Sequence, residues 1–259
     1  MLPDAAEPAE AEPVAEGGSG ADSAGVPWAG RTLAAQPFPG DDGSAEPSLV
    51  IALATGELAG IVRAWASSRV LVPIVAVLGE GDDVRASAEP GRGDKSADMA
   101  LVTITGPDGH RILPTFSSTA ALATWNRSAR PVPVEAARAA QAAVLEGCDR
   151  IAIDLAGPVP GRLPRPAVWA VAQGRDWMPP ADDPEVLVAV AGVVASIAEL
   201  VAHRCEPDGV AGLNIVLGLP PGLAAEPVQQ IVGRISQKLA ADQRVAERVE
   251  SLRLTVRTA

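Results

Sequence analysis

The sequence contains few aromatic residues and few of the cysteines and histidines that form disulfides and bind metals. Aromatic residues make up 3% of its 259 residues, and it holds two cysteines, two histidines and two lysines. Cys148 and Cys205 lie far apart, in segments of different character, which argues against a disulfide framework and predicts reduced thiols.

Metal and catalytic sites also lack their usual components. The soft ligands are His110, Cys148, His203 and Cys205. His203 and Cys205 would share one face of a strand, but two ligands do not complete a structural zinc site, so no metal is expected. The sequence has no G-x-S-x-G motif, and its adjacent acidic pairs stand in turn-rich segments. We therefore expect no catalytic residues and a protein that is not an enzyme.

A cofactor site is equally absent from the motifs. Residues 91–96 (GRGDKS) superficially resemble a phosphate-binding loop, but the first glycine is misplaced and a strand follows where a helix is needed. No nucleotide or other cofactor is expected.

The negative charge is concentrated at the N-terminus. The chain has a net charge of −11, and residues 1–48, with nine carboxylates and one arginine, account for −8 of it. The rest of the chain is nearly neutral and has few aromatic residues, so it lacks the cationic surface and the stacking platforms that nucleic-acid binding requires. We therefore expect no binding to nucleic acid.

Long apolar runs are missing as well. The apolar, uncharged run over residues 186–198 has 13 residues, against about 20 needed to span a bilayer. The N-terminus has neither the cationic nor the apolar region of a secretory signal. We expect no membrane association and a cytoplasmic location.

What the chain does have is enough hydrophobic material, 47% of its residues, for a sizeable core. Residues 1–26 are rich in Ala, Glu, Pro, Gly and Ser and are predicted to be a disordered acidic tail. The sequence then predicts an α/β domain over 27–181 and a smaller α+β domain over 182–259, each a mixed sheet packed with helices. Asp182-Asp183-Pro184 marks the boundary because an acidic cap followed by proline opens a helix.

Local signals predict the elements of these domains. Helices are expected from 47 to 65 with a break at Thr55-Gly56, after Ser117 or Ser118, over 135–146, over 184–196 as an amphipathic helix, over 228–239, and after Asp242. Strands are expected at 70–77, 99–105, 111–115, 150–155, 200–205, 213–217 and 252–256, and 167–173 reads as a short helix or strand. Gly106 to Gly109 predicts a hairpin, and Pro73 indicates an edge strand or a bulge. Trp65 and Trp125 are predicted to lie in the core.

Residues 92–134 hold the most specific stretch. It contains Leu113-Pro114-Thr115-Phe116-Ser117-Ser118 after a hairpin, and then a short helix with Trp125. This stretch resembles the SseB family (enhanced serine sensitivity) in its longer form from high-GC bacteria. WAGRTL (28–33), SRVLVPIVAV (68–77) and AVWAVAQGRDWMPP (167–180) extend the resemblance. It implies an N-terminal α/β domain and a smaller C-terminal α/β domain, and it brings no catalytic residues.

A loop entering the hairpin is the predicted binding surface. It comprises Asp94, Lys95, Ser96 and Asp98, with Trp28 and Arg31 as further candidates. Lys95 is one of two lysines in an arginine-rich chain, and loops on a rigid scaffold concentrate binding residues. The alternative is structural, with the carboxylates fixing a turn and pairing with Lys95.

Three classes of function follow. The first is a non-enzymatic binding or adaptor module with an unknown protein partner. The second is an enzyme or enzyme subunit of small-molecule, sulfur or serine metabolism that uses Cys148. The third is an accessory protein of translation or secretion. The oligomeric state stays open.

Overall fold

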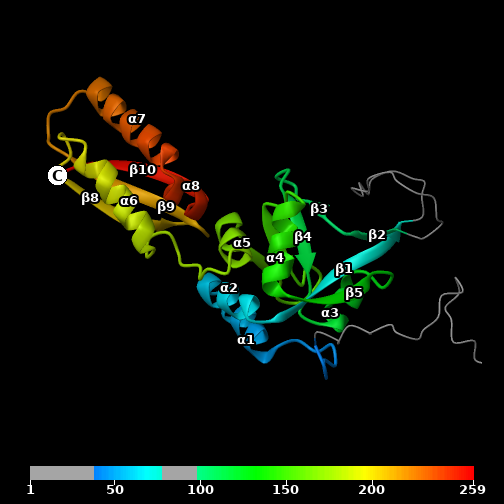
Figure 1. Ribbon diagram of the computed structural model, residues 1–259. Coiled ribbons are helices and arrows are strands. Elements are labelled where there is room, and N and C mark those ends of the chain that lie inside the picture. The colour runs from blue at the N-terminus through cyan, green and yellow to red at the C-terminus, as the bar shows by residue number, and fades with distance from the viewer. Residues whose placement is uncertain (1–37, 78–97) are drawn as a thin grey trace, which may run out of the picture. The chain divides into compact units, whose positions relative to one another are not determined.

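Short runs of helices and of strands follow one another along the chain, as the changes in hydrophobic period predict. The computed structural model describes residues 38–77 and 98–259, and the segment Gly40–Ala259 is one compact unit. Its helices are α1 (Pro47–Thr55), α2 (Leu58–Ala66), α3 (Thr119–Trp125), α4 (Ala136–Leu145), α5 (Arg165–Ala172), α6 (Pro184–Ala195), α7 (Ala225–Ala241) and α8 (Gln243–Arg248) (Figure 1). Its strands are β1 (Arg69–Val77), β2 (Asp98–Leu101), β3 (Ile104–Thr105), β4 (Arg111–Thr115), β5 (Arg130–Glu135), β6 (Arg150–Ile153), β7 (Gly161–Leu163), β8 (Ala202–Asp208), β9 (Gly212–Leu219) and β10 (Ser251–Thr258). Helices packed on several sheets confirm the predicted mixed α/β class.

Most helices begin and end at the predicted signals. Pro47 and Pro184 occupy first turns, Ser118 caps α3 and Asp242 caps α8. Gly147 follows α4 with φ +66°, the left-handed conformation that glycine adopts without a steric penalty. The backbone groups left free at helix ends explain why such local signals are reliable.

The first sheet has the order β2-β1-β5, and both pairs are antiparallel. The prediction that Pro73 marks an edge strand or a bulge is wrong, because β1 is the central strand. Pro73 lies opposite Pro131, and its carbonyl accepts from Val102 N–H on the other side. Pro73 and Pro131 thus form a non-hydrogen-bonded pair of the antiparallel ladder. At such a pair neither residue donates to the partner strand, so the missing N–H groups of the two prolines remove no hydrogen bond between β1 and β5.

The second sheet has the order β3-β4-β6-β7, with β4 and β6 parallel. The hairpin at Gly106 to Gly109 is confirmed, since β3 and β4 pair across it. The single strand expected over 99–105 is instead two strands, because β2 pairs with β1 and only β3 pairs with β4. Strands β5 and β7 were not predicted.

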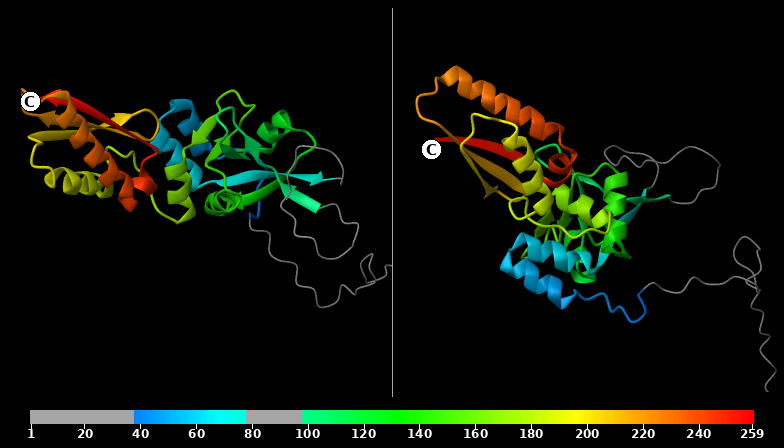
Figure 2. Two further views of the ribbon diagram at one scale, coloured as in Figure 1. Left: turned by 90° about the horizontal axis from the view of Figure 1, so that it is seen from above. Right: turned by 60° about the vertical axis from the view of Figure 1, so that its left-hand side comes forward.

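The third sheet has the order β10-β9-β8, with β9 and β10 parallel. Helices α6 and α7 lie on one face of it (Figure 2). The strand expected over 200–205 runs later, to Asp208, so the residues assigned to its turn continue the strand. Thr255 and Asn214 are hydrogen-bonded side by side at 2.9 Å.

Two main hydrophobic cores hold the unit together. One contains Trp65, which is fully buried as predicted, and joins α1, α2, α4 and α5 to the first two sheets. The other joins α6, α7 and α8 to the third sheet. Trp125 is half-buried and stacks on Phe116, with ring centroids 5.2 Å apart. The predicted boundary at 181/182 stays a prediction, and the predicted tail, residues 1–26, lies outside the described residues.

Candidate functional site

All but one of the six predicted binding residues lie outside the described ranges, namely Trp28, Arg31, Asp94, Lys95 and Ser96. Asp98 is described through its backbone, which begins β2 and pairs with Val77. The recognition role of these residues therefore stays a prediction.

Helix α6 is held firmly at its start. Asp183 accepts a hydrogen bond from the backbone N–H of Glu185 at 2.9 Å, and Pro184 occupies the first helical position. The second carboxylate oxygen of Asp183 accepts from Arg248 of α8 at 2.8 Å. Because Asp183 is buried, this cap and ion pair fix the direction in which α6 leaves the preceding loop.

The inner side of α6 packs into the core, and its outer side is also apolar. The inward residues are Val186, Ala189, Val190 and Val194. The outer side, called the α6 face, consists of Leu187, Val188, Ala191, Gly192 and Ala195, all exposed. Val188 is 61% exposed. The predicted helix is present, but the prediction that it is amphipathic is wrong. Its solvent side is apolar, since Glu185 is the one charged residue of α6.

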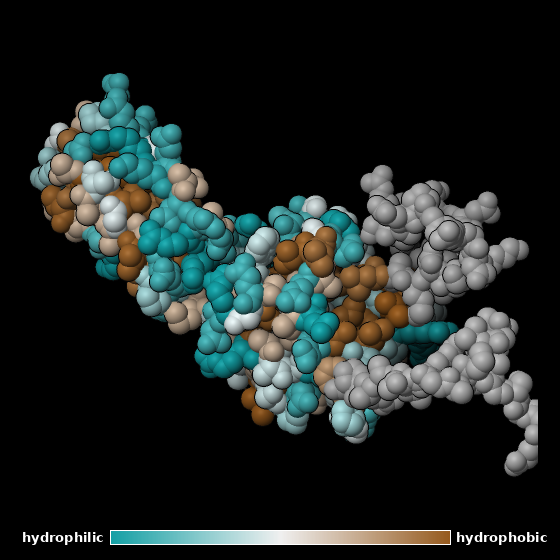
Figure 3. Space-filling model, in the orientation of Figure 1, coloured by the Kyte–Doolittle hydropathy of each residue, from teal (hydrophilic) through white to brown (hydrophobic). Residues whose placement is uncertain are grey.

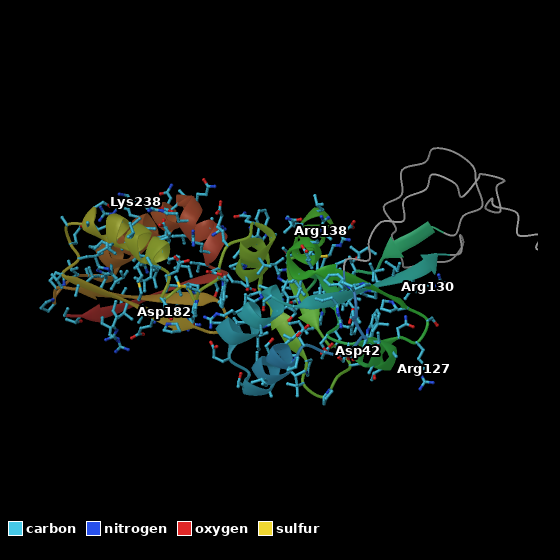
Figure 4. The ribbon with its side chains drawn as sticks, turned by 60° about the horizontal axis from the view of Figure 1, so that its bottom comes forward. Asp42, Arg127, Arg130, Arg138, Asp182 and Lys238 are labelled. Atoms are coloured by element: carbon cyan, nitrogen blue, oxygen red, sulfur yellow. The ribbon has the colours of Figure 1, made fainter. Side chains whose placement is uncertain are left out.

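Charged groups border the α6 face instead of occupying it. Lys238 of α7 donates to Ser196 at 2.7 Å, and Arg234 pairs with Glu199 at 2.6 Å, both at the C-terminal end of α6. Asp182 precedes the other end, and Figure 4 labels it together with Lys238. In Figure 3 brown, tan and white side chains gather over α6, with teal ones around them.

The apolar character of α6 does not make it a membrane span. It has 12 residues, and no helix in residues 38–77 and 98–259 is long and apolar enough to cross a membrane. The signal in the sequence was the uncharged run over 186–198, which indicates a helix without a polar side.

The most specific stretch of the sequence joins the first two sheets. Phe116 exchanges two backbone hydrogen bonds of 2.9 Å with Leu71 of β1. The Thr115 hydroxyl donates to the Ala152 carbonyl at 3.0 Å. Ser117 comes next and turns the chain toward α3. These residues of 113–118 are therefore occupied in building the fold.

Asp154 completes this junction. One carboxylate oxygen accepts from the backbone N–H of Ser117 at 2.8 Å and the other from its hydroxyl at 2.6 Å. Asp154 is 7% exposed and has φ +51°, a left-handed conformation that is uncommon outside glycine. The carbonyl of Ser117 accepts from Arg69 at 3.1 Å, and Arg69 pairs with Asp41 at 2.7 Å.

The comparison with protein families agrees with the resemblance carried by this junction. Residues 49–170 match the model of the SseB protein N-terminal domain. The chain contains an SseB N-terminal domain. Among curated proteins and solved structures, no significant match to the chain was found. The SseB domain runs from α1 into α5, so α6 and the third sheet lie beyond it. The second SseB domain implied by the resemblance stays a prediction.

The potential metal ligands do not form a cluster among the residues that the structure describes. His110, at the start of β4, is hydrogen-bonded to Asp149 through Nδ1 at 2.9 Å. His203 is exposed on β8, and Cys205 faces the core on the same strand. Within the described ranges, no three His, Cys, Asp or Glu side chains come together as a metal-binding group.

The thiol on which the enzyme alternative depends is shielded. Cys148 is 4% exposed, and burial raises the pKa of its thiol to about 11. About one molecule in a thousand is then the nucleophilic thiolate at pH 8. We expect Cys148 to resist iodoacetamide at pH 8 in the folded protein and to react once the chain is unfolded in urea.

Mass spectrometry of the alkylated protein measures this directly. Cys205, which is half-buried and whose pKa burial also raises, is the internal comparison. Rapid labelling of Cys148 at pH 7 in the folded state would contradict the prediction and favour the enzyme alternative.

Proposed function

We propose that this protein acts in the cytoplasm as a non-enzymatic binding or adaptor protein, and that it docks a partner on the α6 face. The single observation that carries the proposal is the exposure of Leu187, Val188, Ala191, Gly192 and Ala195 on one side of a regular helix. A continuous apolar patch on a soluble domain is typical of an interaction site, whereas scattered apolar residues are not.

Gly192 supports a close approach by a partner. Glycine inside a helix is less favourable than alanine by about 1 kcal/mol. A Cβ built on Gly192 meets no atom within 4 Å, so packing inside the protein does not require glycine there. With Ala191 and Ala195 beside it, Gly192 leaves this part of the helix surface without large side chains, so a second helix could approach it closely.

The size of the face favours a short helical segment as its occupant. A helix of 12 residues is about 18 Å long, and a stripe about 10 Å wide on it offers about 200 Å². A stable pair of globular proteins buries about 800 Å² on each side, so this face alone is too small for a dimer of the chain. An amphipathic helix with apolar residues at i, i+3, i+4 and i+7 matches it in length and chemistry.

A lipid surface fits the α6 face less well. Helices that lie on membranes carry many Lys and Arg residues around their apolar side, which attract anionic lipids. Near α6, the cations Arg234 and Arg248 are engaged by Glu199 and Asp183, and Lys238 donates to Ser196, so few cations are available to anionic lipids. The proposed occupant is therefore a protein helix.

A photocrosslinking amino acid identifies that partner. Placed at Ala191, benzoylphenylalanine is expected to give a discrete crosslink in the native host, joined to a peptide with amphipathic helical spacing. The same group at Gln237, an exposed position of α7, is the control. A crosslink to another copy of the chain, or the same products from both positions, would refute the proposed occupant.

Two glycine variants then test the face with the purified partner. Gly192→Arg is expected to weaken binding tenfold or more, because the long side chain would keep the partner helix from approaching closely, while Gly233→Arg on α7 leaves affinity unchanged. An added Cβ meets nothing at either glycine, and arginine favours helix over glycine, so both variants should be as stable as the wild type or more stable by up to about 1 kcal/mol. Isothermal titration calorimetry and urea unfolding measure the two quantities. Equal affinity of both variants would contradict the proposal.

A further inference from the structure

A second candidate site is a cleft away from the α6 face. It has a volume of about 660 Å³, within the range of small-molecule sites. Its lining residues come from the starts of β4, β6, α5 and β10 and are His110, Asp149, Arg150, Arg165, Glu250 and Ser251. Five of the six are ionisable, so a ligand here is bound by charge and hydrogen bonds.

Most of the charged side chains in the cleft are already bonded to a neighbour. Asp149 is bonded to His110 at 2.9 Å. Arg150 pairs with Glu250 at 3.0 Å and also with Asp108. Arg150 is mostly buried, with 14% of its side chain exposed, so these partners hold it in place. Their charges are not available to a ligand without breaking a bond.

Arg165 is the exception among the described residues. It is exposed and forms no ion pair there, and its guanidinium lies 5.8 Å from the centre of the Trp169 ring. Stacking on an aromatic ring orients a guanidinium and leaves its N–H edge free to bind. Among the described residues of the lining, Arg165 is therefore an oriented cation that is not held in an ion pair.

The position of Arg165 at a helix N-terminus gives a second electrostatic reason for an anion to bind there. It is the first residue of α5, and Pro164 before it provides no side-chain cap. The N-terminal end of a helix has positive potential, which disfavours a cation there. A bound anion would pair with the Arg165 guanidinium and would also be favoured by the uncapped helix end.

We infer that this cleft binds a small molecule through one oxyanion group, a carboxylate or a phosphate, held by Arg165. The guanidinium fork matches the geometry of either group. Asp149 and Glu250 disfavour further negative charge and can accept hydrogen bonds from hydroxyl or amino groups of the ligand. The ligand class is therefore a singly anionic molecule with donor groups, and the inference is independent of the α6 face.

Calorimetric titration with defined probes tests this site on the full-length chain. The phosphate arm uses inorganic phosphate and glycerol 3-phosphate, and the carboxylate arm uses lactate and glycerate. Sodium chloride at equal ionic strength controls for screening. We expect at least one probe to bind the wild type more tightly than about 1 mM.

Two arginine variants locate the binding. Arg165→Gln is expected to weaken the bound probe tenfold or more, because a charge-assisted hydrogen bond is lost. Arg162→Gln is the matched control, since Arg162 is also exposed, forms no ion pair among the described residues and does not line the cleft. The inference is overturned if no probe binds the wild type, if Arg165→Gln binds like the wild type, or if both variants weaken binding equally.

Discussion

Replacing Trp65 with alanine is expected to lower the free energy of unfolding by about 3–5 kcal/mol. Trp65 belongs to α2 and is completely buried in the core that joins this helix to the first two sheets. Its indole N–H donates to the Thr115 hydroxyl at 3.4 Å. Alanine leaves a cavity where the ring stood and removes this bond. Domains of this kind are stable by about 5–15 kcal/mol in total, so the loss is a large fraction of the whole.

Urea unfolding followed by far-ultraviolet circular dichroism measures the loss. Trp65→Phe is the control, because it keeps most of the ring volume and removes the N–H donor, and its expected loss is about 1–2 kcal/mol. Trp125→Ala, at a half-buried site, should also lose less than Trp65→Ala. A loss below about 1.5 kcal/mol for Trp65→Ala would contradict the placement of Trp65 in the core.

The same experiment tests the predicted division of the chain. The residues of the C-terminal core, around Leu217 and Ile235, are distinct from those around Trp65. If residues 182–259 fold independently, Trp65→Ala moves one unfolding transition and leaves a second in place. A single transition that moves as a whole would show that the two cores unfold together.

Helix boundaries could be read from the sequence because their causes are local. Ser118, Asp183 and Gly147 satisfy or terminate backbone groups within a few residues of their own position. Strand partners could not be read in this way, because they depend on segments distant in sequence. Thus 99–105 shows one β-rich run, yet β2 and β3 join different sheets. Pro73 appeared to exclude a central strand, and only its pairing with Pro131 shows why it does not.

The candidate surfaces were predictable to different degrees. The uncharged run over 186–198 contained the α6 face, but the binary pattern that distinguishes core from solvent is missing there, so the sequence did not show which side is exposed. The cleft at Arg165 brings together residues from four separate elements, and no sequence spacing connects them. His110 was considered as a metal ligand and is instead paired with Asp149.

Replacing Asp154 with alanine is expected to lower stability by about 2–4 kcal/mol. The change leaves the N–H and the hydroxyl of Ser117 buried without their acceptors. Hydrogen bonds to a charged group contribute about 1.5–3 kcal/mol each, and an unsatisfied buried group adds a desolvation cost. Alanine at φ +51° is also strained, because its Cβ is unfavourable in the left-handed region.

A series of substitutions separates these terms. Asp154→Asn keeps an oxygen for the Ser117 N–H and tolerates the left-handed backbone, so its expected loss is about 1 kcal/mol. Asp154→Gly removes the carboxylate but relieves the strain, and it should be more stable than Asp154→Ala by about 1 kcal/mol. Urea unfolding of the three variants gives both differences.

The order of these variants decides what residues 113–118 do in the SseB domain. If Asn retains most of the stability and Ala does not, Asp154 and Ser117 serve to join β4 to β6, and the specificity of the stretch reflects folding. If Asp154→Ala is as stable as the wild type, the two hydrogen bonds do not support the fold. Asp154 would then be a buried, strained carboxylate without a structural purpose, and such a residue is a candidate for function.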